Sequence, residues 1–289
     1  MKVAVAVPTT GRAGIVKETL RRLERQTRAP DLLVIVGADP ADVAGLSDIP
    51  GVEIGFAERG LCRQRNRAIE LVGDRADVVV FFDDDFVAAE TYLERVDQLF
   101  SQNPDIAAAT GFIVADGISS SGISLEAADA LIAQYEQSGA AGDHIEDRGG
   151  LYGCNMSIRL SAAQGVVFDV NLPLYGWQED IDFTRQLMSR GRVVYTDAFA
   201  GVHLGVKSGR TSGKRLGYSQ IANPAYLLRK GSMPASMAFR LASRNVAANL
   251  IKSLRPEPYV DRRGRLLGNL IGLQDLLLGK ADPTRILRL

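Results

Sequence analysis

The chain has 289 residues, of which 46% are hydrophobic and 24% are charged, and its formal net charge is zero. This composition excludes a disordered or collagen-like chain, and no apolar run approaches the roughly 20 residues that a membrane-spanning helix needs. Two cysteines in so long a chain exclude a disulfide scaffold, so we expect a cytoplasmic protein in a reducing environment.

The first part of the chain alternates short apolar runs with amphipathic segments. We expect strands at 2–7, 32–36, 52–56, 77–82 and 106–114, with helices at 13–26, 61–72 and 88–101. Strand–helix steps of this length indicate a mostly parallel sheet with helices on both faces. The predicted fold class is therefore α/β and Rossmann-like.

The second part of the chain gives weaker signals. We expect a helix near 124–136, a strand at 151–158, a helix at 178–190, a strand at 193–195 and a mobile glycine-rich loop at 205–217. Beyond residue 224 the pattern is helical. The predicted organisation is a catalytic domain over residues 1–222 and a basic helical extension over residues 223–289.

Three consecutive aspartates, Asp83, Asp84 and Asp85, follow the apolar run 78–82. That run has no polar alternation, which is typical of a strand buried on both faces of a parallel sheet. Carboxylates crowded at its carboxyl end repel one another and lose solvation, and a hard cation such as Mn²⁺ or Mg²⁺ relieves both effects. Open α/β sheets also bind ligands at this edge. The triplet therefore predicts a metal-assisted phosphate site.

Two other interpretations of the triplet stay open. The acids could form a solvated turn at the end of the strand. They could also belong to a phosphatase of the haloacid-dehalogenase type, in which a nucleophilic aspartate follows an apolar strand. That type normally has a Gly/Thr pair after its acids and uses the first strand, whereas Phe86 and Val87 follow here and several strands precede.

A second acidic pair, Glu179 and Asp180, follows Trp177 at the start of the predicted helix 178–190. Acids in the first turn of a helix are stabilised by its dipole, so N-terminal capping is one interpretation. The other is functional, because a sugar ring stacks on a tryptophan and a partly desolvated carboxylate is an effective base.

His203 is one of two histidines and follows the predicted strand 193–195. A lone histidine is commonly structural. This one precedes the glycine-rich loop, however, and neutral imidazole suits Mn²⁺, so His203 is a candidate ligand that closes the metal site.

Several motifs follow one another over residues 1–205. They lie at 7–12, at 60–61 with 65–67, at 82–85, at 153–156, at Gly176 with Glu179 and Asp180, and at His203. In this order they resemble an inverting family 2 glycosyltransferase with the GT-A fold. The resemblance implies transfer of a sugar from a nucleotide-sugar donor to a hydroxyl of a saccharide or lipid-linked acceptor, in polysaccharide or glycoconjugate synthesis.

The resemblance also implies which residues bind the donor and the metal. Residues expected at the nucleotide and the diphosphate are Pro8, Thr9, Arg12 and Arg65, and those at the ribose and donor sugar are Asp83 and Asp84. Asp85, in the motif known as DXD, and His203 are expected to hold Mn²⁺ or Mg²⁺.

For the acceptor side, the resemblance implies that Asp180 is the general base. Trp177, Glu179 and Asn155 are expected to shape the acceptor pocket. Basic residues after His203 are expected to neutralise the leaving group when the loop closes; the candidates are Lys207, Arg210, Lys214 and Arg215.

One departure concerns the nucleobase. The family often ends its second strand with two acids followed by Gly-Ser, and here only Asp39 is available after that strand. The base therefore stays open, with a UDP-sugar as the favoured donor and no nucleic acid as partner.

The carboxyl-terminal region is strongly basic. Residues 204–289 hold 16 Lys/Arg against 4 Asp/Glu, whereas residues 1–203 hold 18 against 30. Leu266, Leu270, Leu273 and Leu277 share a helical spacing. This stripe predicts either packing on the protein's own core or peripheral contact with the cytoplasmic face of an anionic membrane.

Two alternatives to a glycosyltransferase also stay open. A nucleotidyltransferase shares the sheet and an acidic metal site, but it normally carries a glycine-rich basic loop after its first strand. Residues 11–14 resemble such a loop only weakly. A non-catalytic nucleotide-sugar-binding subunit would share the fold, although intact Asp85, Asp180 and His203 argue against it.

Overall fold

The computed structural model describes residues 1–208 and 211–289, which divide into two compact units. The first unit contains residues 1–59, 63–167 and 183–208, and the second contains residues 60–62, 168–182 and 211–289. The predicted domain limit at residue 222 falls inside a helix, Gly213–Lys230, and the assignment of two domains stays a prediction.

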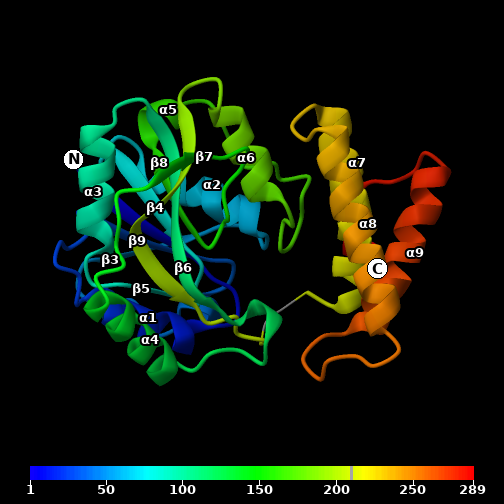
Figure 1. Ribbon diagram of the computed structural model, residues 1–289, viewed down its shortest axis with the longest axis horizontal. Coiled ribbons are helices and arrows are strands. Elements are labelled where there is room, and N and C mark those ends of the chain that lie inside the picture. The colour runs from blue at the N-terminus through cyan, green and yellow to red at the C-terminus, as the bar shows by residue number, and fades with distance from the viewer. Residues whose placement is uncertain (209–210) are drawn as a thin grey trace. The chain divides into compact units, whose positions relative to one another are not determined.

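The first unit is built on one sheet in the strand order β3-β2-β1-β4-β8-β6-β9-β5, with β7 paired to β9 (Figure 1). The strands are β1 (Val3–Pro8), β2 (Leu32–Gly37), β3 (Val52–Phe56), β4 (Val78–Phe82), β5 (Phe86–Ala88), β6 (Ile106–Asp116), β7 (Ile145–Asp147), β8 (Asn155–Arg159) and β9 (Arg192–His203). Neighbours among β1, β2, β3 and β4 run parallel, as do β6 and β9, whereas β8 is antiparallel to β4 and β6. The expected α/β fold with a mostly parallel sheet is confirmed.

Helices cover both faces of this sheet. They are α1 (Ala13–Leu23), α2 (Leu61–Val72), α3 (Tyr92–Gln102), α4 (Leu125–Gln137), α5 (Leu160–Ala163) and α6 (Glu179–Leu187). Side chains of α1 and α3 share one apolar core with Phe82 of β4, while the guanidinium of Arg65 on α2 lies over the ring of Phe81. Because successive residues of a strand point to opposite faces, α1 and α3 cover one face and α2 the other.

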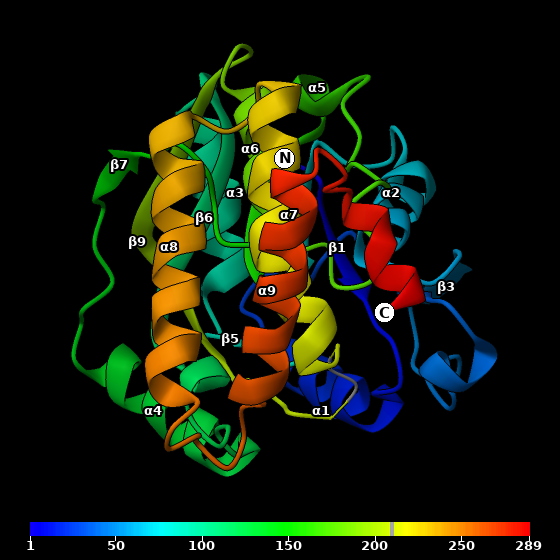
Figure 2. The ribbon, with the colours of Figure 1, turned by 90° about the vertical axis from the view of Figure 1, so that its right-hand side faces the viewer.

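The second unit is dominated by three helices, α7 (Gly213–Lys230), α8 (Ala235–Lys252) and α9 (Arg262–Leu277). Figure 2 shows α8 and α9 running side by side in opposite directions, with α7 behind them. The predicted helical extension is confirmed, although its first helix begins at Gly213, inside the segment that we expected to be a loop.

The main error in the predicted strands concerns β9, which reaches from Arg192 to His203 and not only over 193–195. Its last part contains Ala198, Ala200 and Gly201, which are weak strand formers on their own. Tertiary packing outweighs this preference, because a Cβ on Gly201 would lie 2.4 Å from the ring of Phe86. Only glycine lets β5 approach β9 so closely, and His203 is therefore the last residue of a strand.

Candidate donor and metal site

The site of the first unit begins where β1 and β4 end. These strands are parallel neighbours, so the residues after Pro8 and after Phe82 emerge at the same edge of the sheet. The hydroxyl of Thr9 donates to Asp84 Oδ2 at 2.9 Å, and Arg12 Nη1 donates to Asp84 Oδ1 at 2.7 Å. Two segments about 75 residues apart in sequence therefore meet at one carboxylate.

Asp84 is nearly fully buried, and burial raises its pKa to about 6, although the charge of Arg12 opposes this shift. Arg12 Nη1 also lies 3.7 Å from Asp85, and the nearby carboxylates raise the pKa of Arg12 against the effect of its burial. The guanidinium is thus a permanent counter-charge to the acidic triplet.

Asp83, Asp85 and His203 form a cluster in which one ligand atom of each lies within 4.8 Å of the others. His203 Nε2 is 3.3 Å from Asp85 Oδ1 and 3.9 Å from Asp83 Oδ2. Strand pairing explains this arrangement, because Phe86 of β5 lies opposite His203 of β9 in an antiparallel ladder. Asp85 immediately precedes that pair and therefore faces the histidine.

Two residues that the sequence analysis did not identify hold the other side of the His203 ring. Asp116 Oδ1 lies 3.0 Å from His203 Nδ1, and the hydroxyl of Tyr152 donates to Asp116 Oδ2 at 3.1 Å. Asp116 ends β6 and pairs with His203 in the parallel ladder of β6 and β9. A carboxylate on Nδ1 fixes the ring so that Nε2 points at Asp83 and Asp85.

Burial by itself would lower the pKa of His203, but hydrogen bonds to Asp116 and Asp85 and the charges of Asp85 and Asp83 raise it to about 10. The same contacts lower the pKa of Asp85 and of Asp116 despite their burial. In the absence of another cation, the proton on His203 is the charge that balances the cluster. The site therefore has a strong preference for positive charge at its centre.

These three side chains fit a divalent cation. Two carboxylate oxygens and one imidazole nitrogen are donors that Mn²⁺ and Mg²⁺ accept, the nitrogen favouring Mn²⁺. The carboxylate behind the imidazole is the usual partner of a metal-binding histidine. A divalent metal site at this edge of the sheet is therefore supported by the chemistry of the donor set.

Arg65 lies on α2 and is almost fully buried beside the acidic triplet. Its Nη2 donates to the carbonyl of Gly153 at 2.8 Å and to Asp83 Oδ1 at 3.2 Å. This guanidinium is held in place by the sheet, and it fixes one oxygen of Asp83. Its predicted contact with the nucleotide stays a prediction.

The segment after His203 is tied to the first unit by five contacts. Val206 N donates to Asp85 Oδ2 at 2.7 Å, and Arg12 donates to the carbonyls of Val206 and Ser208. The ammonium of Lys207 donates to the carbonyls of Gly117 and Ile118. The ammonium of Lys207 is therefore hydrogen-bonded to backbone carbonyls of the first unit.

The other predicted basic residues of this segment have different positions. Lys214 and Arg215 lie in the first turn of α7 and not in a loop. Arg210 lies outside the described residues.

Two acids follow β2, Asp39 and Asp42, of which only Asp39 was expected at the site. Asp39 is exposed and caps a short 3₁₀ helix, Pro40–Val43, by accepting from Ala41 N at 2.9 Å. Asp42 is buried and accepts from the backbone N–H groups of Gly11 at 2.6 Å and of Ala38 and Asp39 at 2.9 Å. Asp42 thus joins the turn after β1 to the turn after β2. Contact of Asp39 with a nucleobase stays a prediction.

Asn155 is fully buried at the start of β8. Its side chain accepts from the hydroxyl of Thr110 and donates to the carbonyl of Gly111 at 3.3 Å, which links β8 to β6. These bonds give Asn155 a role inside the sheet. Its predicted contact with the acceptor stays a prediction.

Trp177, Glu179 and Asp180 belong to the second unit and lie at the start of α6. The approach to them has an unusual backbone, because Leu174, Gly176 and Gln178 have φ values of 58°, 64° and 78°. Left-handed conformations of non-glycine residues are uncommon and cluster at functional sites.

Two contacts within the second unit hold this strained segment. Asn223 of α7 donates to the carbonyl of Trp177 at 2.7 Å, and Lys230 at the end of α7 contacts Asp182 and Asp169 at 2.7 Å each. Asp180 Oδ1 accepts from Ile181 N at 2.8 Å, which is a local cap of α6. The segment is therefore fixed at both ends by α7.

The predicted site residues thus fall into two groups. Those brought together in the first unit are Thr9, Arg12, Arg65, Asp83, Asp84, Asp85 and His203, with Pro8 at the end of β1. Those brought together in the second unit are Trp177, Glu179 and Asp180. Sequence reasoning missed Asp42, Asp116 and Tyr152, of which Asp116 had a usable signal as an acid at the end of a predicted strand.

The mostly parallel sheet with an inserted antiparallel strand, together with the acidic and histidine cluster at its carboxyl edge, matches the GT-A fold of glycosyltransferases. Residues 4–138 match the family model described as Glycosyl transferase family 2, and this match confirms the expected resemblance. No protein with a curated description matches the sequence at a significant level.

Solved structures of the same fold share little sequence with the chain. TarS of S. aureus aligns with a TM-score of 0.56 and 14% identity over 89% of this chain, which covers 46% of the TarS chain. The mannosyltransferase PcManGT from Pyrobaculum calidifontis, solved with GDP-Man and Mn²⁺, aligns with a TM-score of 0.56 and 15% identity over 99% of this chain and 85% of its own. GalNAc-T7, solved with UDP, GalNAc and Mn²⁺, aligns with a TM-score of 0.55 and 12% identity over 100% of this chain and 56% of its own.

Proposed function

We propose that the protein is a metal-dependent inverting glycosyltransferase. It transfers a sugar from a nucleotide-sugar donor, with a UDP-sugar favoured, to a hydroxyl of a saccharide or lipid-linked acceptor in polysaccharide or glycoconjugate synthesis. The observation that carries the proposal is the cluster of Asp83, Asp85 and His203 next to Thr9, Arg12 and Asp84 at one edge of the sheet. Structures of the same fold that contain Mn²⁺ with a nucleotide or nucleotide sugar support it.

The donor is held by residues with separate tasks. Thr9 and Arg12 offer a hydroxyl and a guanidinium to the nucleotide, and Asp84 accepts from ribose hydroxyls once those two donors turn away from it. Asp83, Asp85 and His203 would hold Mn²⁺ or Mg²⁺, and such an ion would supply positive charge to stabilise the diphosphate leaving group. Arg65 keeps Asp83 in place from the opposite side.

The reaction is a single displacement at the anomeric carbon. The acceptor oxygen forms a bond to this carbon on one face of the ring, while the bond to the diphosphate oxygen breaks on the other face. Asp180 removes the proton of the acceptor hydroxyl, so the nucleoside diphosphate leaves as an anion and the configuration inverts. Trp177 and Glu179 bind the acceptor sugar beside this base.

The conformation before Asp180 supports its role as the base. The left-handed conformations of Leu174 and Gln178 are costly for non-glycine residues, capping alone does not need them, and the hydrogen bond from Asn223 holds the segment in place. Such preorganisation keeps a carboxylate in one orientation for proton transfer. The ammonium of Lys207 is hydrogen-bonded to the carbonyls of Gly117 and Ile118, so stabilisation of the diphosphate leaving group is assigned to Arg12 and to the metal that the acidic cluster would hold.

The protein is proposed to work in the cytoplasm, where Cys62 and Cys154 stay reduced; both are buried free thiols. Among the described residues, no helix has the length and apolar character to cross a membrane. A lipid-linked acceptor would then be reached from the membrane surface.

Donor class and metal dependence can be tested together by calorimetric titration of UDP, GDP and dTDP, each with and without Mn²⁺. We expect one nucleotide to bind at least about tenfold more tightly with Mn²⁺, since an ion held by the acidic cluster would add an attraction to the phosphates. The variant His203→Ala should lose this enhancement. Nucleotide binding that is indifferent to Mn²⁺ and to His203→Ala would contradict the proposed metal site.

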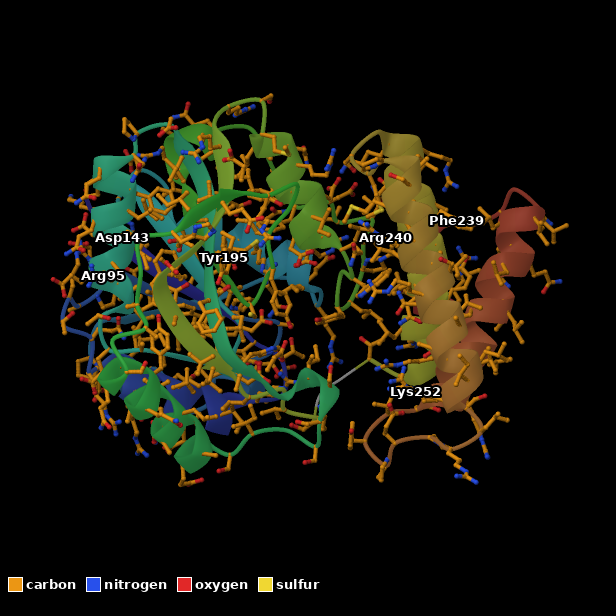
Figure 3. All side chains as sticks on the ribbon, viewed as in Figure 1. Arg95, Asp143, Tyr195, Phe239, Arg240 and Lys252 are labelled. Carbon is orange, nitrogen blue, oxygen red and sulfur yellow. The ribbon has the colours of Figure 1, made fainter. Side chains whose placement is uncertain are left out.

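The role of Asp180 is tested with Asp180→Asn against Asp143→Asn, a change of an exposed acid in a loop that Figure 3 labels. We expect Asp180→Asn to reduce sugar transfer by at least about 10³-fold, because the base is lost, while Mn²⁺-dependent nucleotide binding stays at the wild-type level. Asp143→Asn should leave both unchanged. An equal loss of binding and turnover in Asp180→Asn would remove this residue from the base role.

A further inference from the structure

Helices α8 and α9 expose large apolar side chains along the hairpin that they form. On α8 and just after it these are Phe239, Leu250, Ile251 and Leu254, and on α9 and just after it they are Leu267, Leu270, Leu277 and Leu278. Phe239 is 76%, Ile251 69% and Leu277 88% exposed. We call these eight residues the outer face.

Helical geometry places the outer face on coherent sides of the two helices. Phe239 and Leu250 are eleven residues apart, which at 3.6 residues per turn leaves them only about 20° apart around the axis of α8. Leu267, Leu270 and Leu278 fall within about 80° around α9 by the same count. Large apolar side chains exposed on two neighbouring helices indicate an interaction surface.

The inner faces of the same helices are made of glycines and amides. A Cβ on Gly217 of α7 would lie 2.0 Å from the carbonyl oxygen of Arg265, and a Cβ on Gly268 of α9 would lie 2.0 Å from that of Lys214. Helices α7 and α9 therefore touch backbone to backbone, which only glycine at these positions allows.

Buried amides complete this inner packing. Asn249 of α8 donates to Asn269 of α9 and to Gln220 of α7, in each case at 2.8 Å. Asn269 donates to the carbonyl of Gly217 at 2.7 Å. Helices α8 and α9 are thus held by close backbone approach and hydrogen bonds, and none of their own leucines is fully buried, whereas Leu227 of α7 is buried.

This distribution is the reverse of the pattern of an ordinary water-soluble bundle, whose leucines lie inside. Small residues and amides between helices, with large apolar residues outward, are typical of helices in lipid. Because no described helix can cross a bilayer, a hairpin lying in the plane of the membrane surface fits the outer face.

The charges around the outer face select the kind of lipid. Helix α8 contains no Asp or Glu, and its exposed residues include Arg240 and Arg244, with Lys252 at its end (Figure 3). Residues 211–289 hold 14 Lys/Arg against 4 Asp/Glu. Among the described residues, Arg240, Arg244 and Arg255 make no ion pair with an acid of the protein. Phosphate head groups of an anionic lipid complement these cations.

We propose that the outer face of α8 and α9 docks the protein on an anionic phospholipid surface. The apolar side chains enter the boundary between head groups and acyl chains, and Arg240, Arg244 and Arg255 lie at the level of the phosphates. The proposal goes beyond the proposed reaction, because neither Asp180 nor the metal cluster takes part in it.

Vesicle flotation of the full chain tests the docking. The probe is a vesicle of phosphatidylcholine with or without phosphatidylglycerol, without donor or metal. We expect binding to the anionic vesicles only, and a loss of binding as salt is raised, because exposed charges are screened within about 10 Å at 0.1 M salt.

Matched variants distinguish binding through the outer face from nonspecific binding of the protein to vesicles. Ile251→Ser with Leu277→Ser should weaken binding at least about tenfold, whereas Val167→Ser with Met188→Ser, which are 62% and 46% exposed elsewhere, should not. Arg240→Gln with Arg244→Gln should weaken binding to anionic vesicles about tenfold, and Arg21→Gln with Arg25→Gln, also exposed, should not.

Three results would overturn the proposal. One is wild-type protein that does not float with anionic vesicles, and another is equal binding by the two apolar double variants. The third is a dimer in analytical ultracentrifugation that Ile251→Ser with Leu277→Ser dissociates, since a second copy of the chain would then cover the outer face. Calorimetric nucleotide binding, measured on the same variants, reports on the donor site separately.

Discussion

Replacing Asp116 by asparagine perturbs the metal cluster without touching a metal-binding atom. The carboxylate of Asp116 lies 3.0 Å from His203 Nδ1, and its hydrogen bond is the first of the contacts that raise the pKa of His203 to about 10. Asparagine keeps the shape of the side chain but removes the charge. The pKa of His203 should therefore fall in Asp116→Asn.

The consequence for Mn²⁺ follows from competition between two cations. Mn²⁺ binds the neutral imidazole, and with a pKa of about 10 only about one His203 in a thousand is neutral at pH 7. Each bound Mn²⁺ then releases one proton, so the apparent affinity of the wild type should rise about tenfold per pH unit, or about 100-fold between pH 6 and pH 8.

In Asp116→Asn the affinity should rise less steeply over the same range, because more of His203 is already neutral. The affinity limit reached at high pH should fall by about 10–100-fold, since the ring has lost the carboxylate that orients it. Tyr152→Phe is the control, because Asp116 keeps its charge and its contact with His203, while the contacts of the Tyr152 hydroxyl with Asp116 at 3.1 Å and with His203 Nδ1 at 3.3 Å are lost.

Calorimetry of Mn²⁺ binding in buffers of different ionisation enthalpy measures the released protons directly. We expect about one proton at pH 7 for the wild type and for Tyr152→Phe, and clearly less for Asp116→Asn. A wild-type affinity that is flat between pH 6 and pH 8, with no proton released, would refute the reasoning, because His203 would then be either neutral or no ligand.

Two further predictions concern stability. The pKa of Asp84 is raised from 3.8 to about 6, so the folded state retains a proton that the unfolded state loses. The free energy of unfolding of the wild type, relative to that of Asp84→Asn, should therefore fall by about 3 kcal/mol as pH rises from about 4 to above 6. Urea unfolding of both proteins at several pH values measures this difference. Gly268→Ala should destabilise the protein by at least about 2 kcal/mol, because its Cβ would overlap the carbonyl of Lys214. The control is Gly14→Ala in α1, where the Cβ meets nothing within 4 Å, and it should be neutral or slightly stabilising. Equal effects of the two changes on urea unfolding would contradict the close contact of α7 and α9.

Local sequence patterns were sufficient to predict strands that consist of one continuous, fully buried apolar run. The run 78–82 predicted a buried strand, and the acids after it predicted the edge where Thr9, Arg12 and Asp84 meet. Parallel strands make such a prediction possible, because the residues that follow them necessarily share an edge.

Patterns failed where long-range packing decides the conformation. β5 has only three residues, and the end of β9 contains the weak strand formers Ala198, Ala200 and Gly201, so neither was recognised; they form strands because they pair with each other. Tyr152 precedes β8 and reaches Asp116 across 36 residues, which no local pattern reveals. The contact of Asp42 with Gly11, between segments 31 residues apart, was equally invisible to local patterns.

The ladder between β5 and β9 also limits how this protein can change. Since Phe86 faces His203 and Val87 faces Val202, inserting a single residue between Asp85 and Phe86 would turn the carboxylate to the other side of the strand. The count of residues from Asp83 to Phe86 is fixed by backbone hydrogen bonds, since Phe86 N donates to the carbonyl of Asp83 and Leu204 N donates to that of Asp85. Mutant libraries that aim at new donors should therefore vary side chains around the segment from Asp83 to Phe86 and keep its number of residues unchanged.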